Sequence, residues 1–435
     1  MKKTILSVCL TVLMLVSLIP LSVSAADEAK PIATAAEFEA MEPTGSYYLA
    51  NDIDFGGKVY DVCIIENFAG KLDGRGHTIF NYTITNDAGS SDAGTFKTIG
   101  VGAKDTMEIK NLNFGKPDQL LSVGGAAGKQ YGVICGTQKN EVELVIENVN
   151  VYANVNLTEA IKCNVAGYIG YSTFVTMKNC TMNGSVSVGN PKTVGTVYMN
   201  AGGFIASQNS LATTLTDCTN NASVTTYCTT KEARAAGIVT YTGKTMEFYN
   251  CVNNGAITVY DSTDSKSDSQ IAGIICDING DFVLLKGCVN NGTIVGQKWC
   301  GGLVAYVRKA GAELDNCINY GAYTKEAEAA SALVANISAS GEAVINPNCK
   351  DETGKVNPNA PTTTAAPETT KAPEAAKAPE TTKAPETTKA PETSKAVSVT
   401  EAPAATPSTA DGTMIAVLAG LMALAACTLL RRKVR

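Results

Sequence analysis

The sequence has little of what catalytic centres are usually made of. It contains one histidine, His77, and one tryptophan, Trp299, in 435 residues. A single histidine leaves no Ser-His-Asp or Cys-His constellation unless His77 itself serves, and no P-loop or dinucleotide-binding fingerprint occurs. His77 lies in Gly74-Arg75-Gly76-His77-Thr78, where we interpret it as a structural hydrogen-bonding residue. We therefore predict no catalytic, cofactor-binding or metal-binding residues and no cofactor.

An excess of positive charge is also absent. The formal net charge is -6, so binding to a nucleic-acid backbone has no electrostatic support. No Cys-x-x-Cys pair is present among the 14 cysteines, and with one histidine this disfavours a zinc site.

The N-terminus predicts export. Lys2 and Lys3 precede an apolar run from Ile5 to about Leu21, and Val23-Ser24-Ala25 supplies small residues for a signal peptidase. We predict a signal peptide over residues 1–25. The alternative, an N-terminal membrane anchor, is disfavoured because the apolar run is short.

The C-terminus predicts attachment to the cell envelope. The apolar run Met414–Leu430 is followed by Arg431, Arg432, Lys433 and Arg435, an arrangement that would leave the basic end on the cytoplasmic side. We predict one transmembrane helix within residues 413–435. The tail resembles that of Gram-positive surface proteins, but Pro407–Asp411 lacks the Leu and Gly of a sortase motif. Membrane anchoring is therefore favoured over covalent attachment to the cell wall.

Residues 356–412 have the composition of a stalk. The unit Ala-Pro-Glu-x-x-Lys begins at Ala366, Ala372, Ala378, Ala384 and Ala390. Proline every six residues prevents a continuous helix and interrupts sheet ladders, so we predict an extended linker without a core. A Pro-rich ligand for another domain is the alternative.

The body of the chain repeats a small-Gly-aliphatic-aliphatic motif, named here the glycine motif. Its copies are centred on Gly132, Gly167, Gly203, Gly237, Gly273 and Gly302, with a degenerate copy at Ala332.

A second motif follows each glycine motif after 13 to 17 residues. It is a turn-forming residue, then Cys, then Asn and Gly nearby, and we name it the cysteine motif. Copies contain Cys180, Cys218, Cys251, Cys288 and Cys317, and Asn111-Leu112 and Asn148-Val149 are earlier relatives. Because Asn, Asp and Gly tolerate positive φ, the column 148, 179, 217, 250, 287 and 316 predicts a repeated bend.

Strands with period-two alternation, separated by bends, in units of about 30 to 37 residues predict an all-β solenoid. A leucine-rich repeat is shorter, and a propeller blade is longer and usually has aromatic markers. We predict a right-handed parallel β-helix, with an N-terminal cap and first coils in residues 26–105 and the repeat β-helix in 106–355. The Cys and Asn columns should then stack along its axis.

The glycine motif resembles the GLUG repeat of bacterial surface proteins, most closely at Gly167-Tyr168-Ile169-Gly170. Ser46–Asp54 and Phe68–Ile79 look like the leader segments of pectate-lyase-like β-helices and of regions beside IgA-protease-type enzymes. The resemblance implies a β-helix at the cell surface, and it implies little about activity because fold does not determine function.

Several acids deserve consideration as ligands or catalysts. Asp52, Asp54 and Asp73 belong to the leader, and we interpret Asp52 and Asp54 as turn and cap residues, with calcium binding as the alternative. Asp261, Asp264, Asp268 and Asp277 lie close in sequence and could supply a glycosidase pair. The segment from Ser262 to Ser269 is more simply an exposed polar loop.

These features give two main hypotheses. The first is a non-catalytic surface-display or adhesion protein, monomeric, binding an extracellular glycan or host-matrix protein. The second is an envelope-anchored polysaccharide lyase or glycoside hydrolase, which would need acids and a Lys or Arg from adjacent coils to converge in a groove. A passive coat protein is a third.

The cysteines provide the first test. Cys9 and Cys427 fall in the two terminal apolar runs, and twelve remain in the exported part. Stacked cysteines in a β-helix could form disulfides, but we predict buried free thiols because the body is large enough to fold without them. Mass spectrometry of denatured, unreduced protein should show most of the twelve alkylated; fewer than four would contradict the prediction.

Overall fold

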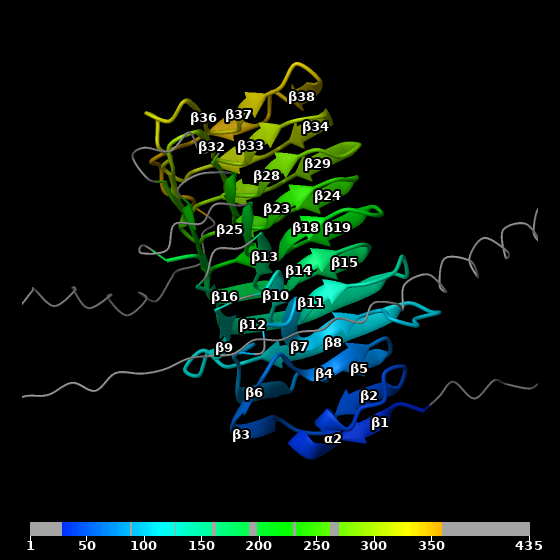
Figure 1. Ribbon diagram of the computed structural model, residues 1–435. Helices are drawn as coiled ribbons and strands as arrows, with labels where there is room; N and C mark the ends of the chain where they lie inside the picture. The colour runs from blue at the N-terminus through cyan, green and yellow to red at the C-terminus, as the bar shows by residue number, and fades with distance from the viewer. Residues whose placement is uncertain are drawn as a thin grey trace, which may run out of the picture. The chain divides into compact units, whose positions relative to one another are not determined.

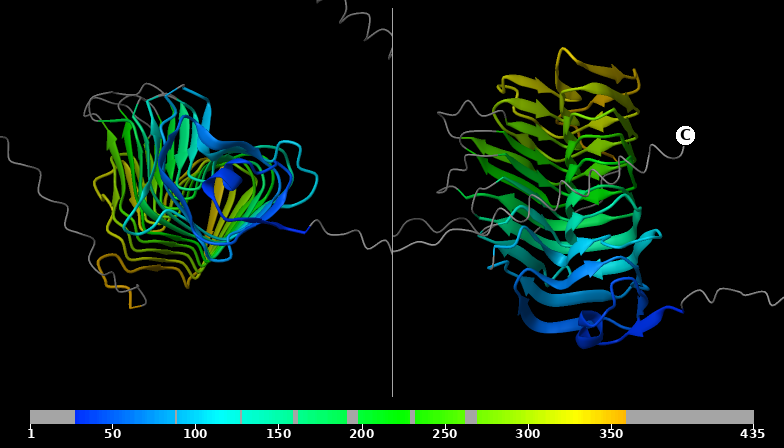
Figure 2. Two further views of the ribbon diagram at one scale, coloured as in Figure 1. Left: turned by 90° about the horizontal axis from the view of Figure 1, so that it is seen from below. Right: turned by 45° about the vertical axis from the view of Figure 1, so that its right-hand side comes forward.

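The computed structural model describes residues 28–87, 89–126, 128–158, 162–190, 198–228, 232–261 and 269–358. These residues form an all-β parallel solenoid of about eight turns. Figure 1 shows the coils stacked from α2 (Ala35–Glu39) and β1 at one end to β38 at the other, and Figure 2 shows the stack from below and from the side. The predicted signal peptide and C-terminal helix, and all but the first three residues of the linker, lie outside the described residues. In the described ranges, no helix is long and apolar enough to cross a membrane.

The described strands form two sheets. The larger, of 23 strands, contains β1 (Lys30–Ile32), β2 (Ser46–Leu49), β3 (Ile53–Tyr60), β5 (Lys71–Asp73), β6 (Thr78–Ile84), β8 (Met107–Phe114), β9 (Leu121–Gly125), β12 (Leu144–Leu157), β15 (Val175–Lys178), β16 (Thr181–Val188), β19 (Thr213–Thr216), β20 (Thr219–Asn220), β21 (Ser223–Cys228), β24 (Met246–Tyr249), β25 (Val252–Asn253), β26 (Ile257–Asp261), β29 (Phe282–Lys286), β30 (Val289–Asn290), β31 (Ile294–Val295), β34 (Ala310–Asp315), β35 (Ile318–Asn319), β38 (Gly341–Ile345) and β39 (Lys350–Asp351).

The smaller sheet, of 16 strands, contains β4 (Cys63–Phe68), β7 (Asp92–Ile99), β10 (Gln130–Gly132), β11 (Cys135–Gln138), β13 (Cys163–Ala166), β14 (Ile169–Ser172), β17 (Met199–Gly202), β18 (Ile205–Gln208), β22 (Ala233–Ala236), β23 (Val239–Thr242), β27 (Gln270–Ala272), β28 (Ile275–Ile278), β32 (Trp299–Gly301), β33 (Val304–Val307), β36 (Ala329–Ser331) and β37 (Val334–Ile337).

The predicted bend column is confirmed. Asn148, Asn179, Asp217, Asn250 and Asn316 have φ between 51° and 54°, and Gly287 has φ 68°. Their side chains also bond along the axis: Asn148 Nδ2 donates to Asn111 Oδ1 at 2.9 Å, and Asn250 Nδ2 donates to Asp217 Oδ1 at 3.1 Å. The residue at each bend therefore adopts a left-handed backbone conformation. At Asn148 and Asn250, its side chain also bonds to the residue at the same position of a neighbouring coil.

A ladder of buried asparagines follows the bend. Asn220, Asn253, Asn290 and Asn319 are all fully buried and stack in register through β20, β25, β30 and β35. Asn220 Nδ2 donates to Asn253 Oδ1 at 2.8 Å, and the next two steps measure 2.7 Å each. Each carboxamide also donates to the carbonyl two residues later in its own coil. Each of these four coils thus buries a polar group whose hydrogen bonds are supplied by its own coil and by the neighbouring coils.

The glycine column lies against this asparagine ladder. A β-carbon added to Gly237 would collide with the carbonyl oxygen of Gly273 and with the side chain of Asn253. The same holds one coil away, where a β-carbon on Gly273 would meet Gly302 O and Asn290. Each asparagine belongs to the cysteine motif that follows the glycine, and it lies 16 or 17 residues after that glycine in the sequence. The glycines are required by close approach and not by positive φ.

The prediction is wrong for the first copy of the glycine motif, which lies one residue out of register with the others. Gly132 pairs with Ala166 and not with Gly167, so Val133 occupies the position equivalent to the column glycines. The preceding coil also differs from the later ones, because its single strand β7 pairs with both β10 and β11, whereas later coils have two separate strands there. The glycine column therefore begins at Gly167.

The cysteine column stacks as predicted. Its five predicted members are buried free thiols just before the paired strands β16, β20, β25, β30 and β35: Cys180, Cys218, Cys251, Cys288 and Cys317. Cys349, a half-buried free thiol just before β39, extends the column by one coil. Burial raises the pKa of the Cys218 and Cys288 thiols well above their usual range. These cysteines act as small apolar core residues.

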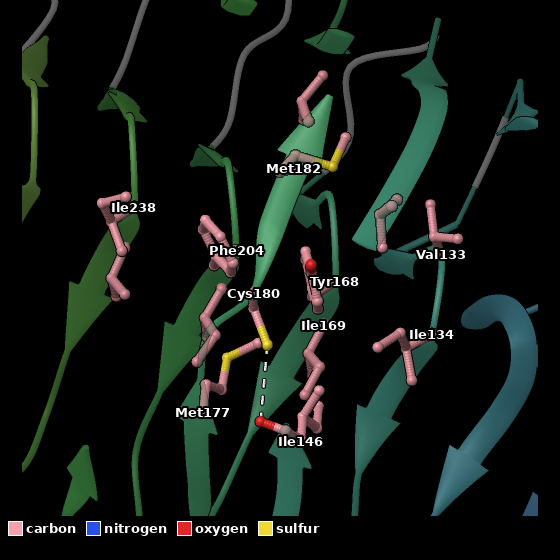
Figure 3. Close-up of a cluster of buried hydrophobic side chains, with 14 of the residues drawn as sticks. Val133, Ile134, Ile146, Tyr168, Ile169, Met177, Cys180, Met182, Phe204 and Ile238 are labelled. Atoms are coloured by element: carbon pink, nitrogen blue, oxygen red, sulfur yellow. Dashed lines mark hydrogen bonds between the residues drawn. The ribbon is translucent and has the colours of Figure 1, made fainter. Parts of the chain in front are cut away.

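The interior is closed at its first coils and packed tightly in its middle. Thr34 and Glu37 form a capping box on α2, and Phe38 of this helix is fully buried beside Phe55 and Phe96. In the middle, the rings of Tyr168 and Phe204 stack with centroids 4.6 Å apart. Figure 3 shows this pair beside Cys180, whose Sγ donates to Ile146 O at 3.6 Å.

Replacing Gly237 by alanine should strongly destabilise the solenoid, because the new methyl group meets a backbone carbonyl and a buried amide that cannot both move. We expect a loss of about 2 kcal/mol or more in the free energy of unfolding, measured by urea denaturation. Gly311→Ala is the matched control: its β-carbon would lie 3.3 Å from a ring carbon of Phe282 and should change the midpoint little. Equal effects of the two substitutions would contradict the role assigned to the glycine column.

Candidate functional site

In three successive coils, two neighbouring strands meet at an angle that opens to the outside of the solenoid. Ala236, Ala272, Cys276 and Ala305 form a small buried cluster separate from the main core. They alternate along their strands with core residues such as Ile275, so their side chains lie on the outer side of the sheet. Their burial means that the β22–β27 side and the β23–β28–β33 side meet at an inside corner.

A groove of about 440 Å³ lies at this corner and spans several coils. It is lined almost entirely by amide, aromatic and charged side chains: Gln130, Lys162, Asn164, Tyr171, Tyr198, Asn200, Ser207, Asn209, Glu232, Arg234 and Tyr241. Other hollows lie near Lys71 and Asp105 and near Val252 and Ile318, and neither combines several aromatic rings with charged groups. We therefore take the corner groove as the candidate functional site.

One wall of the groove is a ladder of amides. Asn164 Nδ2 donates to Gln130 Oε1 at 2.8 Å, Asn200 Nδ2 donates to Asn164 Oδ1 at 2.6 Å, and Arg234 Nη1 donates to Asn200 Oδ1 at 3.2 Å. The residues occupy equivalent positions in β10, β13, β17 and β22. Each asparagine keeps one N–H and one oxygen lone pair beyond these bonds. The amide side chains of this wall are therefore held in one orientation and still have hydrogen-bonding groups to offer.

The opposite wall carries aromatic rings. Tyr171 and Tyr241 are half-buried and lie on β14 and β23, with Ser207 between them in the same column. Burial and the neighbouring Tyr241 raise the pKa of Tyr171, so its phenol remains a hydrogen-bond donor at neutral pH. At the rim, Tyr198 is 42 % exposed, with Lys162 Nζ 5.8 Å from the centre of its ring.

A cluster of two acids and two arginines bounds the groove. Asp277, which is fully buried, has its Oδ2 2.9 Å from Nη2 of both Arg234 and Arg308. Glu232 pairs with Arg234 and lies 3.4 Å from Arg308 Nη2. Four side chains from three successive coils are thus joined, and their formal charges cancel.

The same cluster is held by aromatic contacts. Arg308 lies 4.9 Å from the ring centre of Tyr306, whose ring is 4.4 Å from that of Trp299. Burial would lower the pKa of Arg308, but hydrogen bonds and charge from Asp277 and the charge of Glu232 outweigh it and raise the pKa. Arg308 is therefore a permanent cation and cannot serve as a base.

Two buried polar groups beside the cluster have no hydrogen-bond partner: Nε of Arg234 and the carboxamide of Gln270. Gln270 stacks on Arg234 in the amide column. Buried polar groups without hydrogen bonds cost free energy. At this end of the groove, the polar groups of the wall are therefore the least well satisfied by other protein groups.

The acids singled out in the leader do not meet in the groove. Asp52 Oδ1 accepts from Thr78 N at 3.0 Å and lies 3.4 Å from His77 Nδ1. Asp54 and Asp73 accept backbone N–H bonds from residues two positions later, Gly56 and Arg75. The contacts of Asp54 and Asp73 are turn contacts, as interpreted for Asp54. Asp52 instead bonds to a residue 26 positions later, in the next coil, so its contact is not a turn contact.

The second set of acids, Asp261, Asp264, Asp268 and Asp277, does not form one cluster in the described part of the chain. Asp264 and Asp268 lie outside the described residues, and Asp261 ends β26. Asp277 instead lies in β28 and belongs to the ion cluster. Over the described ranges, no group of three or more His, Cys, Asp or Glu side chains could hold a metal ion.

The groove residues have a sequence signal of their own, separate from the glycine and cysteine motifs. The third residue before each column glycine is Asn164, Asn200, Arg234, Gln270 or Trp299, so the first members of this series supply the amide wall. The fourth residue after each column glycine is Tyr171, Ser207, Tyr241, Asp277 or Tyr306. These positions vary in residue type, so no repeated letter marks them. Only alignment of the coils on the glycine column reveals them.

Comparison with known proteins gives one similar fold. No family model matches the chain, so the GLUG resemblance has no match there, and no curated protein matches it. A crystal structure of a candidate immunoglobulin A1 protease from Bacteroides ovatus is similar over 74% of this chain and 85% of that chain, with 15% sequence identity and a TM-score of 0.42. A likeness this distant is too weak to transfer an activity.

Replacing Asp277 by asparagine should leave Arg234 and Arg308 without their shared carboxylate. Removing one partner from a buried charge cluster typically costs about 3 kcal/mol or more, and we expect the urea midpoint to fall accordingly. Asp281→Asn is the control, because Asp281 is 71% exposed and 3.7 Å from Lys244. If both variants unfold at the same urea concentration, the ion cluster does not contribute to stability.

Proposed function

We propose that this chain is a non-catalytic surface-display protein that binds an extracellular glycan in the corner groove. One observation supports it above all: aromatic rings and an amide ladder face each other along the solenoid axis, in register with the coils. Aromatic faces pack against the C–H faces of sugar rings, and planar amides bond pairs of hydroxyls. Both walls are held before any ligand arrives, which lowers the entropy cost of binding.

The proposal extends to the ends of the chain. The signal peptide at 1–25 would direct export, the linker at 356–412 would lift the solenoid from the envelope, and the helix at 413–435 would anchor it in the membrane. The glycine motif would be a GLUG-type repeat on a right-handed β-helix, and the protein would act as a monomer. These assignments derive from composition and motif pattern.

The second candidate is an envelope-anchored polysaccharide lyase or glycoside hydrolase. The convergence of Glu232 and Asp277 with two arginines from adjacent coils favours it. Against it, the carboxylates of Glu232 and Asp277 are both engaged by guanidinium groups, and Asp277 has no exposed surface. A general acid or nucleophile must reach the substrate, so we place binding ahead of catalysis.

A glycan array probed with the purified full chain should identify a bound polysaccharide, and calorimetry should then give its affinity. Tyr241→Ala should weaken binding at least tenfold, since it removes one aromatic face of the groove. The control is Tyr260→Ala: Tyr260 is 54 % exposed and stacks on Tyr227 outside the groove lining. Absence of binding to any glycan would favour a passive coat.

The same samples test catalysis. New reducing ends or unsaturated products, abolished by Glu232→Gln, would overturn the non-catalytic proposal in favour of the enzyme. Products that persist in Glu232→Gln and are absent from a mock purification would place an active centre outside the ion cluster.

A further inference from the structure

The tyrosines of the groove wall recur at every second coil. Tyr171, Tyr241 and Tyr306 occupy one column, and Ser207 and Asp277 fill the coils between them. Neighbouring parallel strands are about 4.8 Å apart, so successive tyrosines in the column are separated by roughly 9–10 Å. Within the groove itself, the pair Tyr171 and Tyr241 therefore presents two aromatic surfaces one two-coil step apart.

The coil between the two tyrosines is polar. Ser207 and Asn209 lie on the tyrosine wall, and Asn209 Nδ2 donates to Ser207 Oγ at 3.1 Å. Asn200 faces them from the amide wall. The groove thus alternates aromatic, polar and aromatic along its length.

The lining of the groove has too little net positive charge to attract a polyanion. Glu232 and Arg234 belong to the neutralised ion cluster, and Lys162 is the remaining charged residue of the lining. A neutral ligand suits this balance better than a polyuronate, which would need a cation for each of its carboxylates.

We propose that the groove binds an uncharged, extended β-1,4-linked glycan lying parallel to the solenoid axis; this inference rests on the proposed function. In such a chain each ring is turned by about half a turn relative to its neighbour. Every second ring therefore presents the same face, at a repeat close to two coil spacings. Rings one and three would stack on Tyr171 and Tyr241, and the ring between them would direct its hydroxyls to Ser207, Asn209 and Asn200.

The test is a length series of cello-, chito-, xylo- and manno-oligosaccharides, with malto-oligosaccharides as the α-1,4-linked comparison, titrated into the full chain by calorimetry. For at least one β-1,4 series, affinity should rise at least fivefold from two rings to three, because the third ring reaches the second tyrosine. Malto-oligosaccharides of equal length should bind at least tenfold more weakly. Tyr171→Ala and Tyr241→Ala should each remove the two-to-three step, and Tyr260→Ala should keep it.

The outcomes separate this inference from the proposed function. Binding of an α-1,4-linked or acidic glycan that Tyr241→Ala weakens would overturn the β-1,4 inference and keep the groove as a glycan site. An even gain per ring, without the step at three, would overturn the two-coil match. No binding of any glycan, with unchanged thermal unfolding of both tyrosine variants, would overturn both proposals.

Discussion

A buried carboxamide in each of four consecutive coils fixes this solenoid. Asn253 has no exposed surface, and its Nδ2 group donates both to its own coil and to the next. An amide buried without these partners would cost roughly 1–3 kcal/mol. The ladder is therefore favourable only when the coils are stacked in one register. The glycine column completes the constraint, since any side chain at Gly237 would occupy the space of Asn253.

That register places every other residue of the coil in a column. It stacks the free thiols of the cysteine column inside the solenoid, and it brings Gln130, Asn164 and Asn200 together in the amide wall. It also sets Glu232, Asp277 and Arg308 close enough to form one ion cluster although 76 residues separate the first and last. The groove is thus a consequence of the same stacking that satisfies the buried asparagines. Hydrogen bonds between the coils hold its walls rigid without a ligand.

The repeated residues of this chain were readable because the physical demands on them are strict. Positive φ at the bend favours Asn, Asp or Gly, and close contact with a carbonyl of the next coil requires Gly from Gly167 to Gly302, so both columns could be predicted. Gly132 was misplaced because Tyr131-Gly132-Val133-Ile134 keeps the motif while the coil below it pairs differently. Asp277 lies near a stretch read as an exposed polar loop, yet it is fully buried, because arginines from two other coils neutralise it.

By itself, the sequence determined the repeating coil, its bends and its stacked asparagines and cysteines, since each follows from backbone conformation or packing within one unit. It also supplied the expectations of export, linker and anchor. The tertiary structure alone decided where the corner groove forms. The groove is built from positions that vary among Tyr, Ser, Asp, Asn and Arg, so no motif marks them. They form a site only because stacking aligns residues that lie about 35 positions apart along the chain.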